Sequence, residues 1–206
     1  MSDSNAGARK QRNCRNHSFI VNGVLHDNKE SKDKAIDILI YDVAKCFDEV
    51  WPEDTINVLY DLGVKNENLC LLYEGTKKSF IAINTPSGKS ERFEVNNIIS
   101  QGSTWGPLMT SSSVDTIGKD AQESGQNTYL YKNIAKIPPL SFVDDIAAIT
   151  KCGVDSVMTN AVINTQIQTK KLRFGKEKYR KAMYQTPPGT LWYTLVHSDT
   201  LWYTLA

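Results

Sequence analysis

The chain is poor in cysteine and histidine and has no long apolar run. Its cysteines are few and widely spaced, with no Cys-x-x-Cys motif and no histidine pair beside them: Cys14, Cys46, Cys70 and Cys152. This spacing argues against a structural zinc site and a disulfide framework, so we expect reduced thiols. No apolar stretch approaches the roughly 18 residues of a membrane span, and the N-terminus lacks a signal-peptide core. We therefore expect a soluble, intracellular protein with no membrane partner.

The net charge of +1 conceals two basic regions. Residues 1–15 carry Arg9, Lys10, Arg12 and Arg15, with Asp3 as the only acid. Residues 170–181 carry seven lysine and arginine residues, with Glu177 as the only acid. Such asymmetry would let two edges of a fold grip a polyanion, although basic runs are more often solvated faces.

Two adjacent carboxylates, Asp144 and Asp145, lie between two short apolar runs in residues 138–149. Each run is short enough for a strand and too short for a helix, so we predict a hairpin with the acids at its tip. Neighbouring carboxylates repel each other and are costly to desolvate. A bound Mg²⁺ would remove that penalty. An ordinary exposed acidic turn is the alternative.

With 40% hydrophobic residues, the chain can form one substantial core. We expect residues 1 to about 11 to be disordered or extended. Periodicity predicts helices at 13–26, 53–62, 66–78, 107–123 and 154–170. It predicts strands at 36–41, 80–85, 91–95, 128–132, 138–143, 146–150, 172–174 and 179–183. The strand over 36–41 continues to Asp42, on the face of its isoleucines.

A hexapeptide, Thr-Leu-Trp-Tyr-Thr-Leu, occurs at 190–195 and again at 200–205. Two copies are too few for a solenoid. We interpret residues 184–206 as an atypical tail foreign to the domain, with a β-hairpin as the structural alternative.

Three pieces occur in order along the chain: a strand ending at Asp42, a glycine loop at Gln101 and Gly102, and the hairpin of Asp144 and Asp145. A carboxylate on a strand beside a carboxylate on a hairpin can hold two divalent ions about 4 Å apart, the arrangement used for in-line phosphoryl transfer.

These motifs resemble those of reverse transcriptases of non-LTR (LINE-like) retrotransposons. Residues 42–48 (Asp-Val-Ala-Lys-Cys-Phe-Asp) are similar to the first palm motif, Asp-x-x-Lys-Ala-Phe-Asp. Residues 101–108 resemble Gln-Gly-x-x-x-x-Pro-Leu, and residues 142–145 resemble the Tyr/Phe-Ala/Val-Asp-Asp box. Residues 7–13 are similar to Gly-Phe-Arg-x-Gly-Arg-Ser, and residues 172–178 to Leu-x-x-Asn-x-x-Lys. The resemblance covers residues 5 to about 183.

The resemblance implies a role for each matching residue. The metal ligands would be Asp42, Asp144, the Val43 carbonyl and, more loosely, Asp145. Phe47 would stack beneath the incoming sugar and exclude a 2′-hydroxyl; a plain core aromatic is the alternative. The remaining implied contacts are Gln101 and Gly102 with nucleotide and template, Lys178 with the triphosphate, and Arg9 and Arg12 with template phosphates. A simple turn and solvated basic residues are the alternatives for these.

The chain departs from the family pattern in several places. Ala8 replaces the usual Phe, Gln11 the usual Gly, and Ser103-Thr104-Trp105 is unusual inside the glycine motif. From the family pattern we expect no basic fingers hairpin and no thumb helices within these residues. We therefore expect a palm-centred fragment: residues 1–34 as partial fingers, 35–183 as the palm, and 184–206 as the tail.

We predict an α+β fold, a reverse-transcriptase-like palm whose antiparallel sheet is backed by helices, with partial fingers and no thumb. The expected activity is RNA-directed DNA polymerisation with Mg²⁺, or Mn²⁺ in its place. Its expected partners are an RNA template, a DNA primer, dNTPs and the remaining domains of a polyprotein. A non-catalytic nucleic-acid-binding module is one alternative. A metal-dependent phosphatase or receiver-like domain is another, and it would require a parallel sheet.

Overall fold

A computed structural model of the chain describes residues 1–7, 9–31, 35–76, 79–95, 99, 103–124, 130–131, 135–151, 153–174, 180–184 and 191–194. Within these ranges no helix is both long and apolar enough to cross a membrane.

The helices are α1 (Cys14–Ser31), α2 (Cys46–Glu49), α3 (Pro52–Asp61), α4 (Asn66–Thr76), α5 (Gly106–Glu123) and α6 (Val154–Thr169). The longer strands are β1 (Ile36–Asp42), β9 (Asp145–Lys151), β10 (Arg180–Tyr184) and β11 (Leu191–Thr194). The shorter strands are β2 (Ser79–Ile81), β3 (Asn84–Thr85), β4 (Gly88–Lys89), β5 (Phe93–Val95), β6 (Leu130–Tyr131), β7 (Ala135–Lys136) and β8 (Leu140–Phe142).

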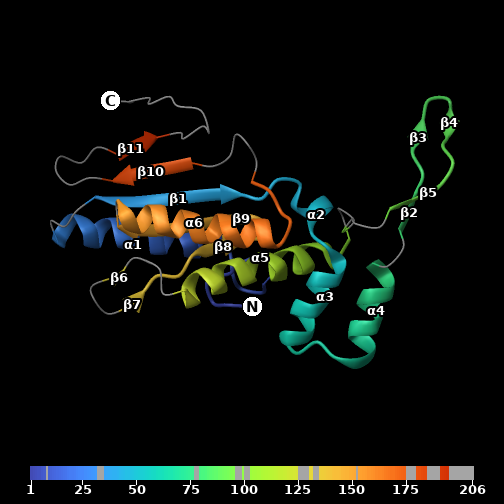
Figure 1. Cartoon of the computed structure of the whole chain (residues 1–206), viewed down its shortest axis with the longest axis horizontal. Coiled ribbons are helices and arrows are strands. Elements are labelled where there is room, and N and C mark those ends of the chain that lie inside the picture. Colours follow the sequence, from blue (N-terminus) through green and yellow to red (C-terminus); the bar gives the residue numbers. More distant parts are fainter. Residues whose placement is uncertain are drawn as a thin grey trace.

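The largest sheet has five strands in the order β11-β10-β1-β9-β8 (Figure 1). Every neighbouring pair in it is antiparallel. The predicted antiparallel sheet is thereby confirmed, and the receiver-like alternative, which needs a parallel sheet, is wrong. The predicted hairpin is also confirmed, because β8 and β9 pair directly.

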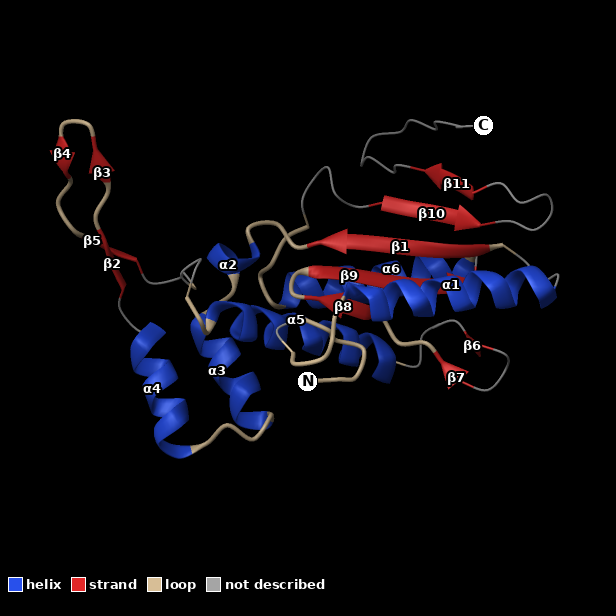
Figure 2. Cartoon of the chain, turned by 180° about the vertical axis from the view of Figure 1, so that it is seen from behind, coloured by secondary structure: helices blue, strands red, loops and turns tan. Residues whose placement is uncertain are grey.

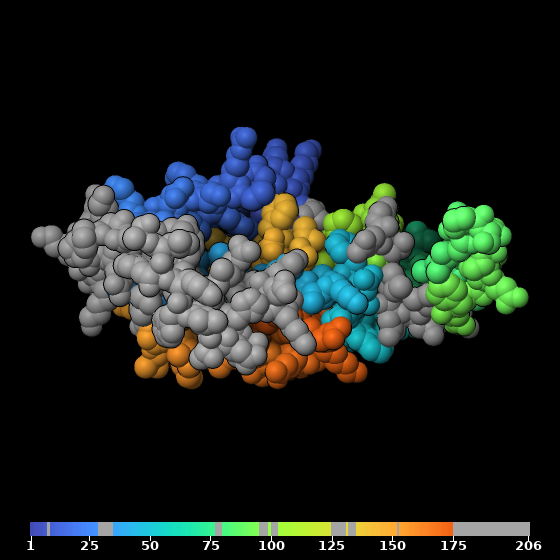
Figure 3. All heavy atoms as spheres, turned by 90° about the horizontal axis from the view of Figure 1, so that it is seen from above, coloured from blue at the N-terminus to red at the C-terminus, as the bar shows by residue number. Residues whose placement is uncertain are grey.

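Helices cover both faces of this sheet. Seen from above, blue α1 and orange α6 lie on opposite sides of the molecule (Figure 3). Leu39 and Tyr41 of β1 belong to the main core with Ile117 of α5 and Ile163 of α6, and all four side chains are fully buried. Ile36 faces the other way and packs with Val24 of α1 and Ile149 of β9. Burying each large apolar side chain contributes about 1.5–3 kcal/mol. Strand β1 is therefore buried on both faces for most of its length.

A two-stranded arm extends from the far end of the molecule beyond α4 (Figure 2). Its inner ladder pairs β2 with β5, and its outer ladder pairs β3 with β4. A turn at Pro86 and Ser87 connects β3 to β4. This is the hairpin predicted from Pro86-Ser87-Gly88-Lys89. Phe80, Ile83 and Phe93 are exposed on it.

At the N-terminus, which we expected to be disordered or extended, the structure contradicts disorder and agrees with an extended segment. Residues 2–7 are not disordered: Ser4, Asn5 and Ala6 are buried, and Asn5 forms a parallel bridge to Ser141 of β8. These small, largely polar residues gave no periodic signal, and their partners lie more than a hundred residues away in the chain.

The first copy of the repeated hexapeptide also departs from the expected foreign tail. Its residues Leu191–Thr194 form β11, which pairs with β10 at the edge of the main sheet. The second copy lies outside the described residues. The predicted strand at 172–174 is reduced to a single bridge between Phe174 and Val43.

Candidate functional site

Two acids that are 103 positions apart in sequence are direct neighbours in the sheet. Strands β1 and β9 pair so that the Cα of Asp42 lies opposite the Cα of Asp145. Directly opposed residues in an antiparallel pair project to the same face, with Cβ atoms about 4.5–5.5 Å apart. Asp42 is partly buried and Asp145 is exposed. The register thus places two carboxylates on one side of the sheet at one end of β1.

The third acid lies in the turn between β8 and β9. The backbone N–H of Val43 donates to the carbonyl oxygen of Asp144 at 3.4 Å, so the turn contacts the end of β1. Val143 has a φ of 58°, in the left-handed region. A β-branched residue there is an outlier that costs about 1–3 kcal/mol and persists only where its surroundings hold it. The acids at 144 and 145 therefore follow a strained turn.

Asp145, which we expected to be the looser metal ligand, lies nearer to Asp42 in the sheet than that expectation implies. Asp145, not Asp144, is the residue paired with Asp42 in the ladder. Asp144 occupies the turn, where its side chain is not fixed to either face by strand alternation. The ligand roles of Asp42, Val43, Asp144 and Asp145 stay predictions.

The segment after β1, residues 43–45, makes a sharp turn next to these acids and leads into α2. Lys45 has a φ of 46° and begins α2. The Ala44 N–H donates to the Arg173 carbonyl at 2.7 Å. Burial, followed by the negative charges of Asp144 and Asp42, raises the pKa of the Cys46 thiol to about 12. The Cys46 thiol therefore lies close enough to both carboxylates for their charge to raise its pKa, and it stays protonated at neutral pH.

Phe47 is partly buried against the main core, and its carbonyl accepts a hydrogen bond from the Ile99 N–H at 3.0 Å. Nearby, Arg173 and Glu49 form an ion pair, with Arg173 Nε 3.1 Å from Glu49 Oε1. The hydrogen bond from Ile99 ties the backbone at Phe47 directly, whereas the exposed Arg173–Glu49 pair lies two residues further along. The predicted role of Phe47 in sugar selection is untested by these contacts.

A cleft of about 650 Å³ lies on the same face of the sheet as Asp145. Its lining comes from the first turns of α1 and from β8 and β9, and it includes Cys14, His17, Val21, Phe142, Asp145 and Ala147. Asp145 thus borders an open, largely apolar depression.

Arg9 and Arg12, predicted to contact template phosphates, make contacts within the chain. The Arg9 guanidinium donates to the carbonyls of Ser2 and Asn5. Arg12 pairs with exposed Asp3 at 3.0 Å. Exposed ion pairs of this kind are weak, so Arg12 can exchange Asp3 for a phosphate at little cost. Three other predicted site residues, Gln101, Gly102 and Lys178, lie outside the described residues.

The donors at the carboxylate site suit Mg²⁺ in their chemistry. They are hard oxygens: the carboxylates of Asp42 and Asp145, which lie on opposed residues, the carboxylate of Asp144 in the adjoining turn, and the predicted carbonyl of Val43. Among the described residues, no group of three or more His, Cys, Asp or Glu side chains is arranged to hold an ion by itself. Mg²⁺ in nucleotide-handling sites is commonly held by one or two carboxylates and completed by substrate phosphates. The site fits that type and does not resemble a closed protein cage.

A family profile described as "Reverse transcriptase (RNA-dependent DNA polymerase)" matches residues 1–195. No curated protein sequence matches the chain. Among solved structures, apo telomerase from Candida tropicalis, truncated from its C-terminal domain, superposes with a TM-score of 0.64 at 10% identity, covering 95% of this chain and 40% of that one.

Candida albicans telomerase, in complex with a TWJ fragment of telomeric RNA, gives a TM-score of 0.63 at 9% identity, covering 95% of this chain and 35% of that one. A Candida tropicalis telomerase complex with the same kind of fragment gives 0.62 at 13% identity, covering 91% and 31%. The chain thus spans well under half of each of these structures, and at this identity the likeness shows the fold alone.

Proposed function

Because the chain belongs to the reverse transcriptase (RNA-dependent DNA polymerase) family, we propose that it is the palm of such an enzyme and carries its nucleotidyl-transfer site. The observation that carries the proposal is the register of β1 with β9, which sets Asp42 opposite Asp145. These residues belong to two separate motifs, 103 positions apart in sequence, that the pairing of β1 with β9 makes neighbours. The reaction is attack of a primer 3′-hydroxyl on the α-phosphate of a dNTP paired to an RNA template: the hydroxyl loses its proton, the new phosphodiester forms, and pyrophosphate leaves.

The chain's residues would act by positioning and charge. Asp42 and Asp145 present their carboxylates from rigid strands, and Asp144 adds a third from the turn. A bound Mg²⁺, or Mn²⁺, would lower the pKa of the 3′-hydroxyl and neutralise the triphosphate. Phe47, which packs against the main core and whose carbonyl accepts the Ile99 N–H, would meet the incoming sugar and reject a 2′-hydroxyl. Catalysis of this kind rests on preorganisation, which the strand pairing supports.

The cleft between α1 and the hairpin would receive the primer end, since Asp145 borders it. Arg9 and Arg12 would contact template phosphates without reading sequence. We further propose a non-LTR retrotransposon origin, supported by the motifs at residues 42–48 and 101–108. In that setting further domains of a polyprotein would hold the duplex.

The test is extension of a DNA primer on an RNA template by the full protein. Asp144→Asn should abolish Mg²⁺-dependent extension, because it removes an acid of the proposed site. Glu91→Gln removes the same charge from the exposed arm and should extend as the natural chain does. Unchanged extension by Asp144→Asn would remove Asp144 from the site.

The same samples distinguish a polymerase from the alternative, a non-catalytic nucleic-acid-binding module, when template binding is measured beside nucleotide incorporation. Binding of a primed template that weakens steeply with salt, without incorporation in Mg²⁺ or Mn²⁺, would favour a binding module. Incorporation that disappears with Asp144→Asn, while binding persists, supports the polymerase.

A further inference from the structure

The segment Ser2–Gly7, which we call the N-terminal strap, lies along the outer edge of the hairpin that carries the acids. The Ala6 N–H donates to the Ser141 carbonyl at 2.9 Å, and the Ser141 N–H donates to the Ser4 carbonyl at 3.1 Å. Asn5 and Ser141 form a parallel bridge. The strap therefore extends the sheet beside β8, next to the strained turn at Val143.

The strap ends in direct contact with that turn. A Cβ added to Gly7 would lie 2.4 Å from the backbone nitrogen of Val143 and 3.0 Å from its Cα. It would also lie 2.6 Å from the hydroxyl oxygen of Ser111. Glycine permits this approach because it has no side chain. Since the first two of these atoms are backbone, any other residue at position 7 would displace the turn.

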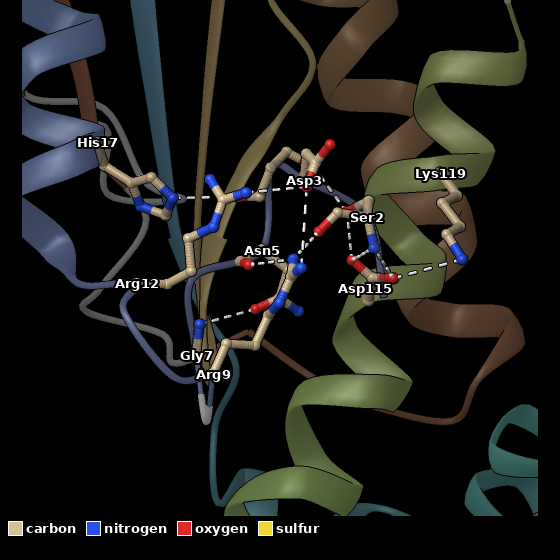
Figure 4. Close-up of polar contacts among 10 residues, drawn as sticks. Ser2, Asp3, Asn5, Gly7, Arg9, Arg12, His17, Asp115 and Lys119 are labelled. Carbon is tan, nitrogen blue, oxygen red and sulfur yellow. Dashed lines mark hydrogen bonds and ion pairs between the residues drawn. The ribbon is translucent and has the colours of Figure 1, made fainter. Parts of the chain in front are cut away.

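Helix α5 anchors the strap at two points, and Figure 4 shows the first of them, between Ser2 and Asp115. Near its start, the Ser2 N–H and hydroxyl donate to the carboxylate of Asp115, which is buried and also pairs with Lys119 at 3.5 Å. Near its end, the side-chain amide of Asn5 donates to the Ser111 carbonyl at 2.9 Å. The strap is thus tied to a helix of the main core.

The Asn5 carboxamide also fixes Gly7. Its oxygen accepts the Gly7 N–H at 2.9 Å and the Ser111 hydroxyl at 3.1 Å. Asn5 is fully buried, so these bonds are shielded from water. From the other side, the His17 Nε2–H of α1 donates to the Ser4 carbonyl at 3.1 Å. Two helices and one strand therefore converge on a piece of chain that supports the Val143–Asp144 turn.

We propose that the strap is a positioning element for nucleotidyl transfer and that Gly7 is its positioning residue. By pressing on Val143, Gly7 holds the left-handed turn in the conformation that keeps Asp145 opposite Asp42 and Asp144 against the end of β1. This inference rests on the proposed function for its catalytic consequence. The mechanical part, support of the turn by the strap, stands by itself.

The test compares Gly7→Ala with Gly23→Ala in the full chain. A Cβ at Gly23, in the middle of α1, meets nothing within 4 Å, so this control adds the same methyl group without a clash. We expect Gly7→Ala to lower kcat for primer extension by about 100-fold, the scale of a misplacement of about 1 Å, with a smaller change in KM for the dNTP. Amide hydrogen exchange should rise across residues 140–146 and stay unchanged in α6. Gly23→Ala should match the natural chain in kcat and in hydrogen exchange across residues 140–146.

Asn5→Ala provides a second variant that adds no atoms, in case Gly7→Ala fails to fold. It removes the bonds to Gly7 and Ser111, and it should raise exchange in the same hairpin. An unchanged kcat with unchanged hairpin exchange would overturn the proposal. So would a loss of activity in which exchange in α6 rises as much as in the hairpin, because that is general destabilisation. If the natural chain extends no primer, the proposed function fails, and hairpin exchange alone decides whether the strap supports the turn.

Discussion

The pairing of Asp42 with Asp145 predicts that removing one of the two charges stabilises the metal-free protein. In Asp145→Asn the opposed carboxylates no longer repel. With Cβ atoms about 5 Å apart, the charges lie about 6 Å apart. Coulomb's law then gives a repulsion of about 0.7 kcal/mol at the dielectric constant of water and about 3 kcal/mol at an effective value of about 20. Because Asp145 is exposed, we expect the lower end, about 1 kcal/mol.

The measurement is thermal unfolding at low ionic strength, with EDTA and with Mg²⁺. A gain of about 1 kcal/mol raises the Tm by about 2–4 °C in a domain of this size. An Mg²⁺ concentration of ten times Kd should stabilise the natural chain by about 1.4 kcal/mol and Asp145→Asn by much less, so the order of stabilities reverses when Mg²⁺ is added.

Glu91→Gln is the matched control, since it removes one exposed acid on the arm. It should leave both the EDTA and the Mg²⁺ values close to those of the natural chain. The reasoning is refuted if Asp145→Asn is less stable in EDTA, or if Mg²⁺ stabilises it as much as the natural chain.

Three further predictions concern the rest of the palm. Ile163→Ala, in the core face of α6, should lower the free energy of unfolding by about 2–5 kcal/mol in urea titrations, whereas exposed Val157→Ala on the same helix should change it by less than about 0.5 kcal/mol. Phe47→Ala should raise ribonucleotide incorporation relative to dNTP about tenfold or more in single-nucleotide kinetics; an unchanged ratio would leave Phe47 a core residue. Cys46 should resist alkylation at pH 8 while exposed Cys14 reacts, as read by peptide mass spectrometry, because burial and then the nearby acids raise its pKa from 9.0 to about 12. Its contribution to stability is full below about pH 9 and is lost as pH rises toward 12; equal alkylation of both thiols in the folded protein would contradict this.

Local patterns predicted the elements that carry the acids. The alternating isoleucines before Asp42 gave β1, and two short apolar runs around Asp144 and Asp145 gave the β8–β9 hairpin. The family motifs then supplied the expectation that these pieces meet. The register that does bring them together is a long-range property, since it depends on which residues of β1 and β9 exchange hydrogen bonds.

The strap could not be predicted in the same way. Ser4, Asn5 and Gly7 are small and polar or lack a side chain, so no apolar periodicity marks them. Their burial depends on Ser111 and Ser141, whose places are set only once α5 and β8 have packed. The resemblance of residues 7–13 to a family motif directed attention to Arg9 and Arg12. In the structure, the backbone of Gly7 lies so close to the hairpin that an added Cβ would clash with Val143.

The most direct test of the central claim is to locate the cation on the chain. Fe²⁺ substituted for Mg²⁺, with ascorbate and peroxide, cleaves the backbone close to where it binds, and mass spectrometry maps the cuts. We predict cuts in both residues 41–48 and residues 141–146, suppressed together by excess Mg²⁺ and absent in Asp42→Asn. Cuts confined to one of these segments, or found in neither, would contradict a shared site.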